Sequence, residues 1–381
     1  WVVLASLAVL AATSIPYLVA WSQATPERIF SGCILLVEDC YSYLGKMRQG
    51  ADGAWLFHIS YTPEQHRGTL FFPFHLLLGK IANLLPEGGL TSRLVLVYHL
   101  ARVIFGFGLL MTVYRFLAAF TRSVRVRQLA WLMVAAGGGF GWLLTLLGKT
   151  RWLGDAPLDL VRSEAFAFIT LYGFPHKSAA QSLLFAGFLC LLQAWEVIGT
   201  SDDVAPYEDV PNGKKYSLVP RVRSQPARSS PFGWATLAGL FWLLMGLVVP
   251  FYVVVVWTVV GAAWAVLCLR HKPSPTILPY EALVASVSAV LSAPIVAYAV
   301  WTFTTEPVYA AWAAQNQILS PHSLHYLAAY GPPLALAAFA ATDAWHDQGK
   351  AWLALAWVTV VPLLVYLPVN IQFRLLAGFQ V

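Results

Sequence analysis

The chain has 381 residues, of which 59% are hydrophobic and 11% are charged, and its mean hydropathy is +0.65. Repeated apolar runs of membrane-spanning length exclude an ordinary water-soluble protein. The formal net charge of +6 does not indicate nucleic acid binding, because in a membrane protein the placement of the positive charges decides their meaning.

Nine apolar runs predict transmembrane helices, since about 20 apolar residues cross a bilayer. They are 2–20, 92–120, 129–147, 178–198, 233–249, 251–269, 277–301, 324–341 and 351–367. We therefore expect an all-α, polytopic transmembrane bundle of about nine spans, forming a single domain over 1–381. Pro250 separates two of the runs, because a proline inside a helix removes a hydrogen bond. Val381 follows the last run with no polar tail, so we expect the natural C-terminus to extend further.

The long segment 21–91 after the first run is predicted to be a loop with two juxtamembrane helices. The first, 38–49, begins with Glu38 and Asp39 and is expected to stop at Gly50, a common residue just after a helix. Cys33 and Cys40 lie in the same loop, and an oxidising compartment would allow them to form a disulfide.

The second juxtamembrane helix is predicted over 70–86. His75, Gly79 and Asn83 recur every four residues and form one polar stripe on an otherwise apolar helix. This pattern is typical of a helix that lies in the membrane interface.

The basic residues favour one orientation. Four connecting segments carry 11 Lys and Arg in 58 residues, whereas the opposite segments carry 10 in 137. The basic set should be cytoplasmic, and it consists of 121–128, 199–232, 270–276 and 342–350. This places the N-terminus in the cytoplasm, the loop 21–91 outside and the protein in the plasma (inner) membrane. Segment 199–232 is then a cytoplasmic connector.

Asp39 is the first candidate catalytic residue. At a helix start the exposed amides and the helix dipole favour negative charge, so one interpretation is a merely acidic helix start. The alternative is that one carboxylate serves as a general base or a metal ligand. Adjacent residues cannot share one helix face, so we favour Asp39, with Glu38 turned toward Arg67 or His66.

Three cations are candidates for holding an anion. His176 and Lys177 follow Pro175 at a predicted helix start, where free amides and fixed charge point at a ligand. Lys177 would otherwise extend to the lipid headgroups. Arg374, just after the last run, is either a second phosphate ligand or an interfacial residue. Further candidate binding residues in the predicted outer segments are Glu164, His66, Arg67, Trp312, Gln315 and Asn316, and Tyr252 lies at the predicted outer end of a span.

The motifs EDCY, PHK, VVPFY, WAAQN, SPHS and QFR carry a resemblance. Through them the chain resembles the GT-C superfamily of integral-membrane glycosyltransferases, and it is similar throughout to bacterial GT-C-like membrane proteins of unassigned activity. The resemblance implies a GT-C-like fold in which a long outer loop with two juxtamembrane helices and later loops close over a lipid-linked donor.

The resemblance also implies transfer of a sugar from a polyprenyl-phosphate donor to an acceptor at the outer face of the membrane. Asp39 would act as base or hold a divalent cation such as Mg or Mn, and His176, Lys177 and Arg374 would contact the phosphate. The expected partners are membrane lipid, the donor, an acceptor and other membrane subunits, with no nucleic acid. Two alternatives stay open: a catalytically silent subunit of a membrane complex, and a lipid or sugar transporter.

Overall fold

The structure, a computed structural model, describes residues 1–86, 88–202, 230–271, 278–346 and 350–381. In these ranges the regular secondary structure is entirely helical, which confirms the predicted all-α class. The elements are α1 (Val2–Ser22), α2 (Val37–Ala51), α3 (Pro73–Leu84), α4 (Leu90–Ala118), α5 (Val124–Ala136), α6 (Gly141–Leu146), α7 (Leu158–Val161), α8 (Ala167–Gly173), α9 (Pro175–Asp202), α10 (Pro231–Val248), α11 (Tyr252–His271), α12 (Leu278–Thr305), α13 (Pro307–Gln315), α14 (Ser323–His346), α15 (Ala351–Leu364) and the 3-10 turn η1 (Gln372–Leu376).

Six of the described helices are long and apolar enough to cross a membrane: α1, α4, α9, α10, α11 and α12. Multiple helices of this kind indicate a multi-pass membrane protein. The other three predicted spans correspond to α5 with α6, to α14 and to the 14-residue helix α15, which do not meet the same criterion. Pro250 separates α10 from α11, as the sequence predicts.

The predicted continuous span 129–147 is wrong. Helix α5 ends at Ala136, and the chain is irregular until α6 begins at Gly141. The Asp159 carboxylate accepts hydrogen bonds from the amides of Gly139 and Gly141, at 2.9 and 3.0 Å, which compensates for the interrupted helix. A Cβ at Gly139 would lie 2.2 Å from the carbonyl oxygen of Ala329. Gly139 therefore allows close contact with α14, and it does so in the irregular segment between α5 and α6.

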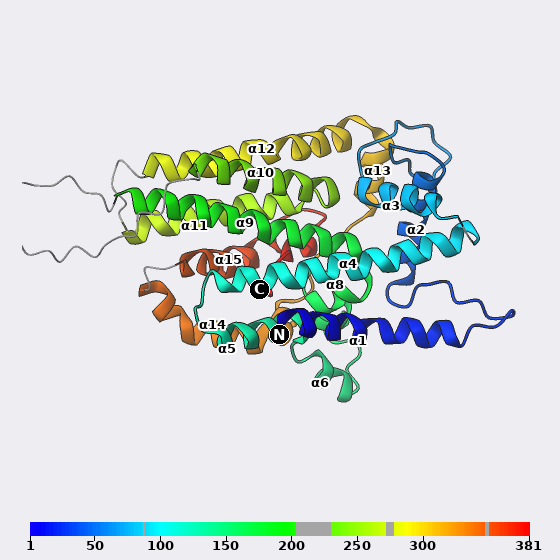
Figure 1. Cartoon of the computed structure of the whole chain (residues 1–381), viewed down its shortest axis with the longest axis horizontal. Helices are drawn as coiled ribbons and strands as arrows, with labels where there is room; N and C mark the ends of the chain where they lie inside the picture. The colour runs from blue at the N-terminus through cyan, green and yellow to red at the C-terminus, as the bar shows by residue number, and fades with distance from the viewer. Residues whose placement is uncertain (87, 203–229, 272–277, 347–349) are drawn as a thin grey trace, which may run out of the picture.

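The helices run roughly parallel, with α2, α3 and α13 gathered at one end of the bundle (Figure 1). The opposite end carries the C-terminal ends of α4, α9 and α11 and the N-terminal ends of α10 and α12. Most of the predicted connector 199–232 lies outside the described residues, since α9 ends at Asp202 and the description resumes at Ser230.

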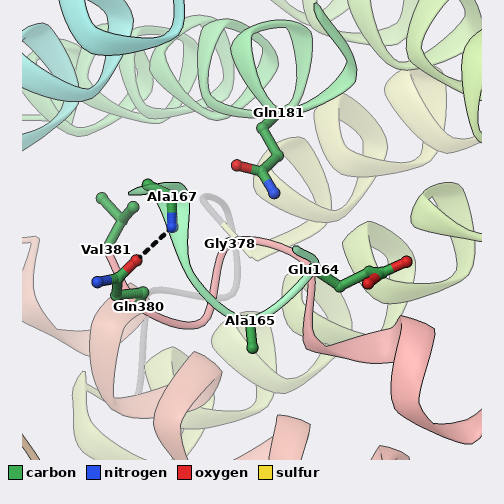
Figure 2. A pocket seen from close by; sticks show the side chains of 7 residues that line it. All are labelled: Glu164, Ala165, Ala167, Gln181, Gly378, Gln380 and Val381. Atoms are coloured by element: carbon green, nitrogen blue, oxygen red, sulfur yellow. Dashed lines mark hydrogen bonds between the residues drawn. The ribbon is translucent and has the colours of Figure 1, made fainter. Parts of the chain in front are cut away.

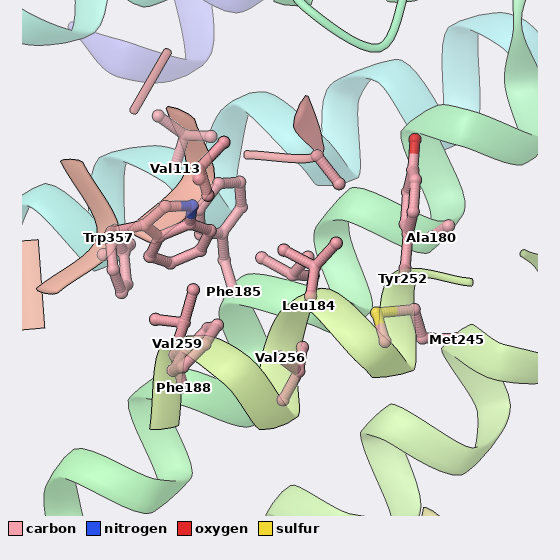
Figure 3. Close-up of a cluster of buried hydrophobic side chains, with 14 of the residues drawn as sticks. Val113, Ala180, Leu184, Phe185, Phe188, Met245, Tyr252, Val256, Val259 and Trp357 are labelled. Atoms are coloured by element: carbon pink, nitrogen blue, oxygen red, sulfur yellow. The ribbon is translucent and has the colours of Figure 1, made fainter. Parts of the chain in front are cut away.

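The centre of the hydrophobic core includes side chains of α4, α9, α10, α11 and α15. Phe185 and Phe188 of α9 lie beside Trp357 of α15, with ring centroids 6.0 and 4.8 Å apart (Figure 3). On the neighbouring side the Trp242 indole sits so close to α9 that a Cβ at Gly187 would lie 2.1 Å from its Nε1. These contacts fix α9, whose first turn carries two candidate site residues.

A buried arginine ties α4 to α1 and to α8. Arg102 donates to the hydroxyls of Thr13 and Ser14, at 3.0 and 2.7 Å, and to the carbonyl of Leu171 at 3.2 Å. Its guanidinium also lies over the Tyr17 ring at 4.9 Å. Hydrogen bonds to neutral groups thus satisfy this charge within the bundle.

Helices α2 and α3 are in backbone contact through two glycines. A Cβ at Gly50 would lie 2.0 Å from the carbonyl oxygen of Leu76, and one at Gly79 would lie 1.8 Å from that of Met47. Gly50 is therefore a packing residue inside α2, which continues to Ala51, and the prediction that it stops the helix is wrong.

The 12-residue helix α3 is too short to span a bilayer. Its predicted polar stripe does not face a water interface as expected. His75 and Gly79 are buried against α2, and only Asn83 is exposed. The first two residues of the stripe therefore mark the part of α3 that α2 covers.

Candidate functional site

Three rings from three elements meet at the end of the bundle where α2 and α3 lie. The Tyr43 ring of α2 stacks on the His75 ring of α3, with centroids 4.7 Å apart and planes 9° apart. The His176 ring, in the first turn of α9, lies 4.5 Å from Tyr43 and 4.8 Å from His75. The glycine contact between α2 and α3 and the packing of α9 in the core hold these rings together.

The two imidazoles have unsatisfied polar atoms. His75 is 1% exposed, and neither of its ring nitrogens has a hydrogen-bond partner within the described part of the chain; the same holds for Nδ1 of His176. Burial, and then the nearby charge of Lys46, hold the pKa of His75 well below its usual range. The neutral ring offers one donor and one acceptor, and buried polar atoms without partners mark a place where a ligand or water would bind.

Lys46 brings a positive charge to the same place. Its Nζ donates to the hydroxyl of Ser42 at 2.6 Å and lies 4.4 Å from the centroid of the Phe72 ring and 5.3 Å from that of Tyr43. Among the described residues no carboxylate lies within ion-pair distance of this ammonium group. Burial lowers the pKa of Lys46 to about 8, and the charge of Asp39 opposes this effect.

Asp39 lies on the same face of α2 as these two residues, since Tyr43 and Lys46 follow it by four and seven positions. Asp39 and Glu38 are both exposed in the first turn. The expectation that Glu38 turns toward Arg67 or His66 finds no support, because the Arg67 guanidinium pairs with Glu306 at 3.6 Å.

Lys177 is already neutralised. Its Nζ lies 2.6 Å from Oε1 of Glu164 and 2.6 Å from the Ser163 hydroxyl, and the side chains of Lys177 and Glu164 are only 11% and 10% exposed. Burial alone would raise the pKa of Glu164, but the charges of Lys177 and Arg374 and the Lys177 hydrogen bond lower it. This ion pair thus contributes little net charge to the site.

Arg374 of η1 lies beside the residue that precedes Tyr252, at the start of α11. The Arg374 guanidinium lies 5.4 Å above the Phe251 ring, and Tyr252 is fully buried. Burial raises the pKa of Tyr43, which is also influenced by the charges of Asp39, Arg374 and Glu164 and by Tyr252. Charged groups from α2, η1 and the segment before α8 therefore all influence the pKa of one tyrosine.

Next to Glu164 is a small pocket with room for about one water molecule (Figure 2). It is lined by Glu164, by Gln181 of α9 and by the last residues of the chain. The Gln380 side chain accepts a hydrogen bond from the Ala167 amide at 2.7 Å. The C-terminal segment thereby supports the stretch that carries Glu164.

The remaining predicted binding residues lie in and around the contact between α13 and the loop that joins α2 to α3. His66 accepts a hydrogen bond from the Ile59 amide at 2.9 Å, so its Nδ1 carries the proton and donates to the Glu64 carbonyl. The Trp312 ring lies 6.2 Å from Phe72, which separates it from Lys46. Arg67, Gln315 and Asn316 lie at the exposed or half-exposed edge of this contact. These residues are not in the ring cluster.

A divalent cation at Asp39 would have few protein ligands. Across the described ranges no group of three or more His, Cys, Asp or Glu side chains could hold a metal ion. The exposed Asp39 and Glu38 alone do not form the multidentate oxygen site that a protein-held Mg²⁺ or Mn²⁺ prefers. The residues therefore do not fit the predicted metal.

Sequence reasoning missed Tyr43 and Lys46 and interpreted His75 only as part of a stripe. The spacing of Asp39, Tyr43 and Lys46 on one helix face was the available signal for the first two. The burial of His75 depends on which helix covers α3, and its own spacing does not reveal that.

Comparisons with known proteins assign no function to this site. No protein-family model matches the chain, and no curated protein or solved structure matches it. A functional conclusion must therefore come from the residues themselves.

Proposed function

We propose that the protein is a GT-C-like membrane glycosyltransferase that moves a sugar from a polyprenyl-phosphate donor to an acceptor at the outer face of the membrane. The observation that supports this most is that Lys46, His75 and His176 gather around the Tyr43 ring, on the face of α2 that also carries the exposed Asp39. The charge of Arg374 also acts on this tyrosine. Unpaired cations and neutral imidazoles suit a phosphate, and a nearby carboxylate suits a hydroxyl that must lose its proton.

The phosphate of the donor would be bound by the cationic side chains that do not already pair with a carboxylate. Lys177 is balanced by Glu164, so we assign it to orienting the start of α9, and we assign direct contact to Lys46, Arg374 and His176. Fixed cations in a site from which water is largely excluded stabilise the charge that develops on a departing lipid phosphate. The neutral imidazoles add N–H donors without further charge.

Asp39 would take the proton of the acceptor hydroxyl. The acceptor oxygen then forms a bond to the anomeric carbon of the sugar, the bond from that carbon to the phosphate oxygen breaks, and the lipid phosphate leaves with the bonding electrons. General-base assistance of this kind supplies about 10²–10⁴-fold in rate. The exposure of Asp39 suits an acceptor that arrives from the aqueous side.

The proposal includes the topology. We propose about nine spans in the plasma membrane, with the N-terminus in the cytoplasm. The three beyond the six long helices are the interrupted segment from α5 to α6, α14, and α15 together with the turns that follow it. The disulfide between Cys33 and Cys40, whose Cα atoms are 6.1 Å apart, supports an outer location for the loop before α2. Disulfides persist in oxidising compartments and are rare in the cytosol.

The test compares adjacent carboxylates. The purified full chain, reconstituted in lipid, is supplied with polyprenyl-phosphate sugars, and donor consumption is measured for the natural chain, for Asp39→Asn and for the matched control Glu38→Gln. We expect Asp39→Asn to lose about 10²–10⁴-fold in rate and Glu38→Gln to keep most of it. Equal turnover in Asp39→Asn would remove the base from the mechanism. A natural chain that consumes none of the donors would instead support a catalytically silent subunit.

A further inference from the structure

A second feature lies away from the ring cluster, where the C-terminal end of α1 meets the start of α4. A cleft of about 320 Å³ opens there, lined by Trp21, Leu85, Pro86, Ser92, Arg93 and Leu96. Its walls are mostly carbon, and among the described residues that line it Arg93 alone is charged.

The Arg93 guanidinium has N–H groups that its contacts within the protein do not use. Its Nη1 donates to the carbonyls of Leu85 and Asn83, at 2.5 and 3.4 Å, and so satisfies the C-terminal end of α3. Its Nε is buried and has no hydrogen-bond partner, and within the described ranges no carboxylate forms an ion pair with it. A guanidinium has five N–H donors and binds phosphate well, so the two donors of Nη2 can meet an anion while Nη1 keeps its structural bonds.

Apolar side chains continue from the cleft along both helices. On α4, Leu96, Leu100 and Ile104 are exposed at intervals of one turn. On α1, Leu18 is exposed one turn before Trp21. The two helices pack together below the cleft, where the Tyr17 and His99 rings are 4.5 Å apart. The cleft is thus the charged end of an apolar track on two membrane-spanning helices.

We infer that this cleft binds a membrane lipid with an anionic phosphate headgroup. The phosphate meets the free donors of Arg93, and an acyl chain lies along Trp21 and Leu96. A soluble anion would satisfy the arginine but would gain nothing from the apolar walls, whereas a lipid satisfies both. The inference does not depend on the proposed sugar transfer, because none of the cleft residues belongs to the ring cluster.

The test uses the purified full chain in detergent with phosphatidylglycerol or phosphatidylcholine, and native mass spectrometry counts the bound lipid. We expect the natural chain to prefer phosphatidylglycerol, and Arg93→Gln to reduce that preference about fivefold, the contribution of one basic residue near a membrane surface. Arg93→Lys should keep part of the preference. Arg28 is an exposed arginine in the loop between α1 and α2, so Arg28→Gln is the matched control and should change nothing.

Arg93 also donates to carbonyls at the C-terminal end of α3, so Arg93→Gln could reduce lipid binding through a folding defect. A second variant separates this effect from a loss of lipid contact. Leu96→Trp fills the cleft while leaving Arg93 intact and should lower retention of phosphatidylglycerol, whereas Leu7→Trp, at an exposed position farther along α1, should not. Unchanged lipid preference in both Arg93→Gln and Leu96→Trp would overturn the inference. Displacement of the lipid by millimolar inorganic phosphate would also overturn it, because the site would then be a simple anion site.

Discussion

Replacing Gly79 with alanine should force α3 away from α2 and disturb the ring cluster. The new Cβ would lie 1.8 Å from the carbonyl oxygen of Met47 and 2.9 Å from the amide nitrogen of Ala51. Ordinary contact begins at about 3.4 Å, so the two backbones must separate by about 1.5 Å. His75 lies one turn before Gly79 and would move with α3, away from the Tyr43 ring on which it stacks.

The cost follows from the same contact. Overpacking a well-packed interior costs about 1–3 kcal/mol, and the upper half of that range applies here because the obstructing atom belongs to backbone and cannot rotate away. Gly45 is the matched control. It also lies within α2, but nothing is within 4 Å of the place its Cβ would take. Alanine there should stabilise the helix by up to about 1 kcal/mol.

The assay is thermal unfolding in detergent, followed by tryptophan fluorescence, for the natural chain and the two variants. We expect the midpoint of Gly79→Ala to fall below that of the natural chain and the midpoint of Gly45→Ala to match or exceed it. If Gly79→Ala unfolds at or above the midpoint of Gly45→Ala, the backbone contact between α2 and α3 does not exist as described.

Two further predictions concern the buried charges. Because the pKa of Lys46 is about 8, binding of inorganic pyrophosphate, measured by calorimetry, should weaken above that pH, and Lys46→Met should bind weakly at every pH. The stability that this group contributes has the opposite sign: between pH 8 and 10.5 only the unfolded chain keeps the proton, so stability rises with pH. Glu164→Gln leaves Lys177 buried without its partner and should cost about 3–5 kcal/mol. Adding Lys177→Met should recover much of that loss in thermal unfolding, and strictly additive losses would contradict the pairing.

The sequence predicted the helices well where composition decides the outcome. Long apolar runs became α4, α9 and α12, and Pro250 ended α10 because its ring prevents a continuous helix. The failure at 129–147 has a different origin. The amides freed by the glycines are satisfied by Asp159, about 20 residues later in the chain, and hydropathy alone cannot reveal such a partner.

The candidate site was predictable only in part. Asp39, Lys177 and Arg374 attracted attention because charge is rare in this chain. His75 did not, because a four-residue period identifies one face of a helix without saying what covers that face. The sequence also did not predict the pairing of Lys177 with Glu164. The two residues are brought together because the chain folds back through the short helix α8.

The hydrogen bonds of Arg102 have a consequence for biogenesis. An arginine at the centre of an isolated helix opposes insertion by about 2.5–3.5 kcal/mol. The hydroxyls of Thr13 and Ser14, which accept hydrogen bonds from Arg102, belong to α1, and α1 leaves the ribosome before α4. Helix α1 is therefore available to accept hydrogen bonds from Arg102 while α4 inserts. A chain that lacks α1 should insert α4 inefficiently, even though α4 is strongly apolar.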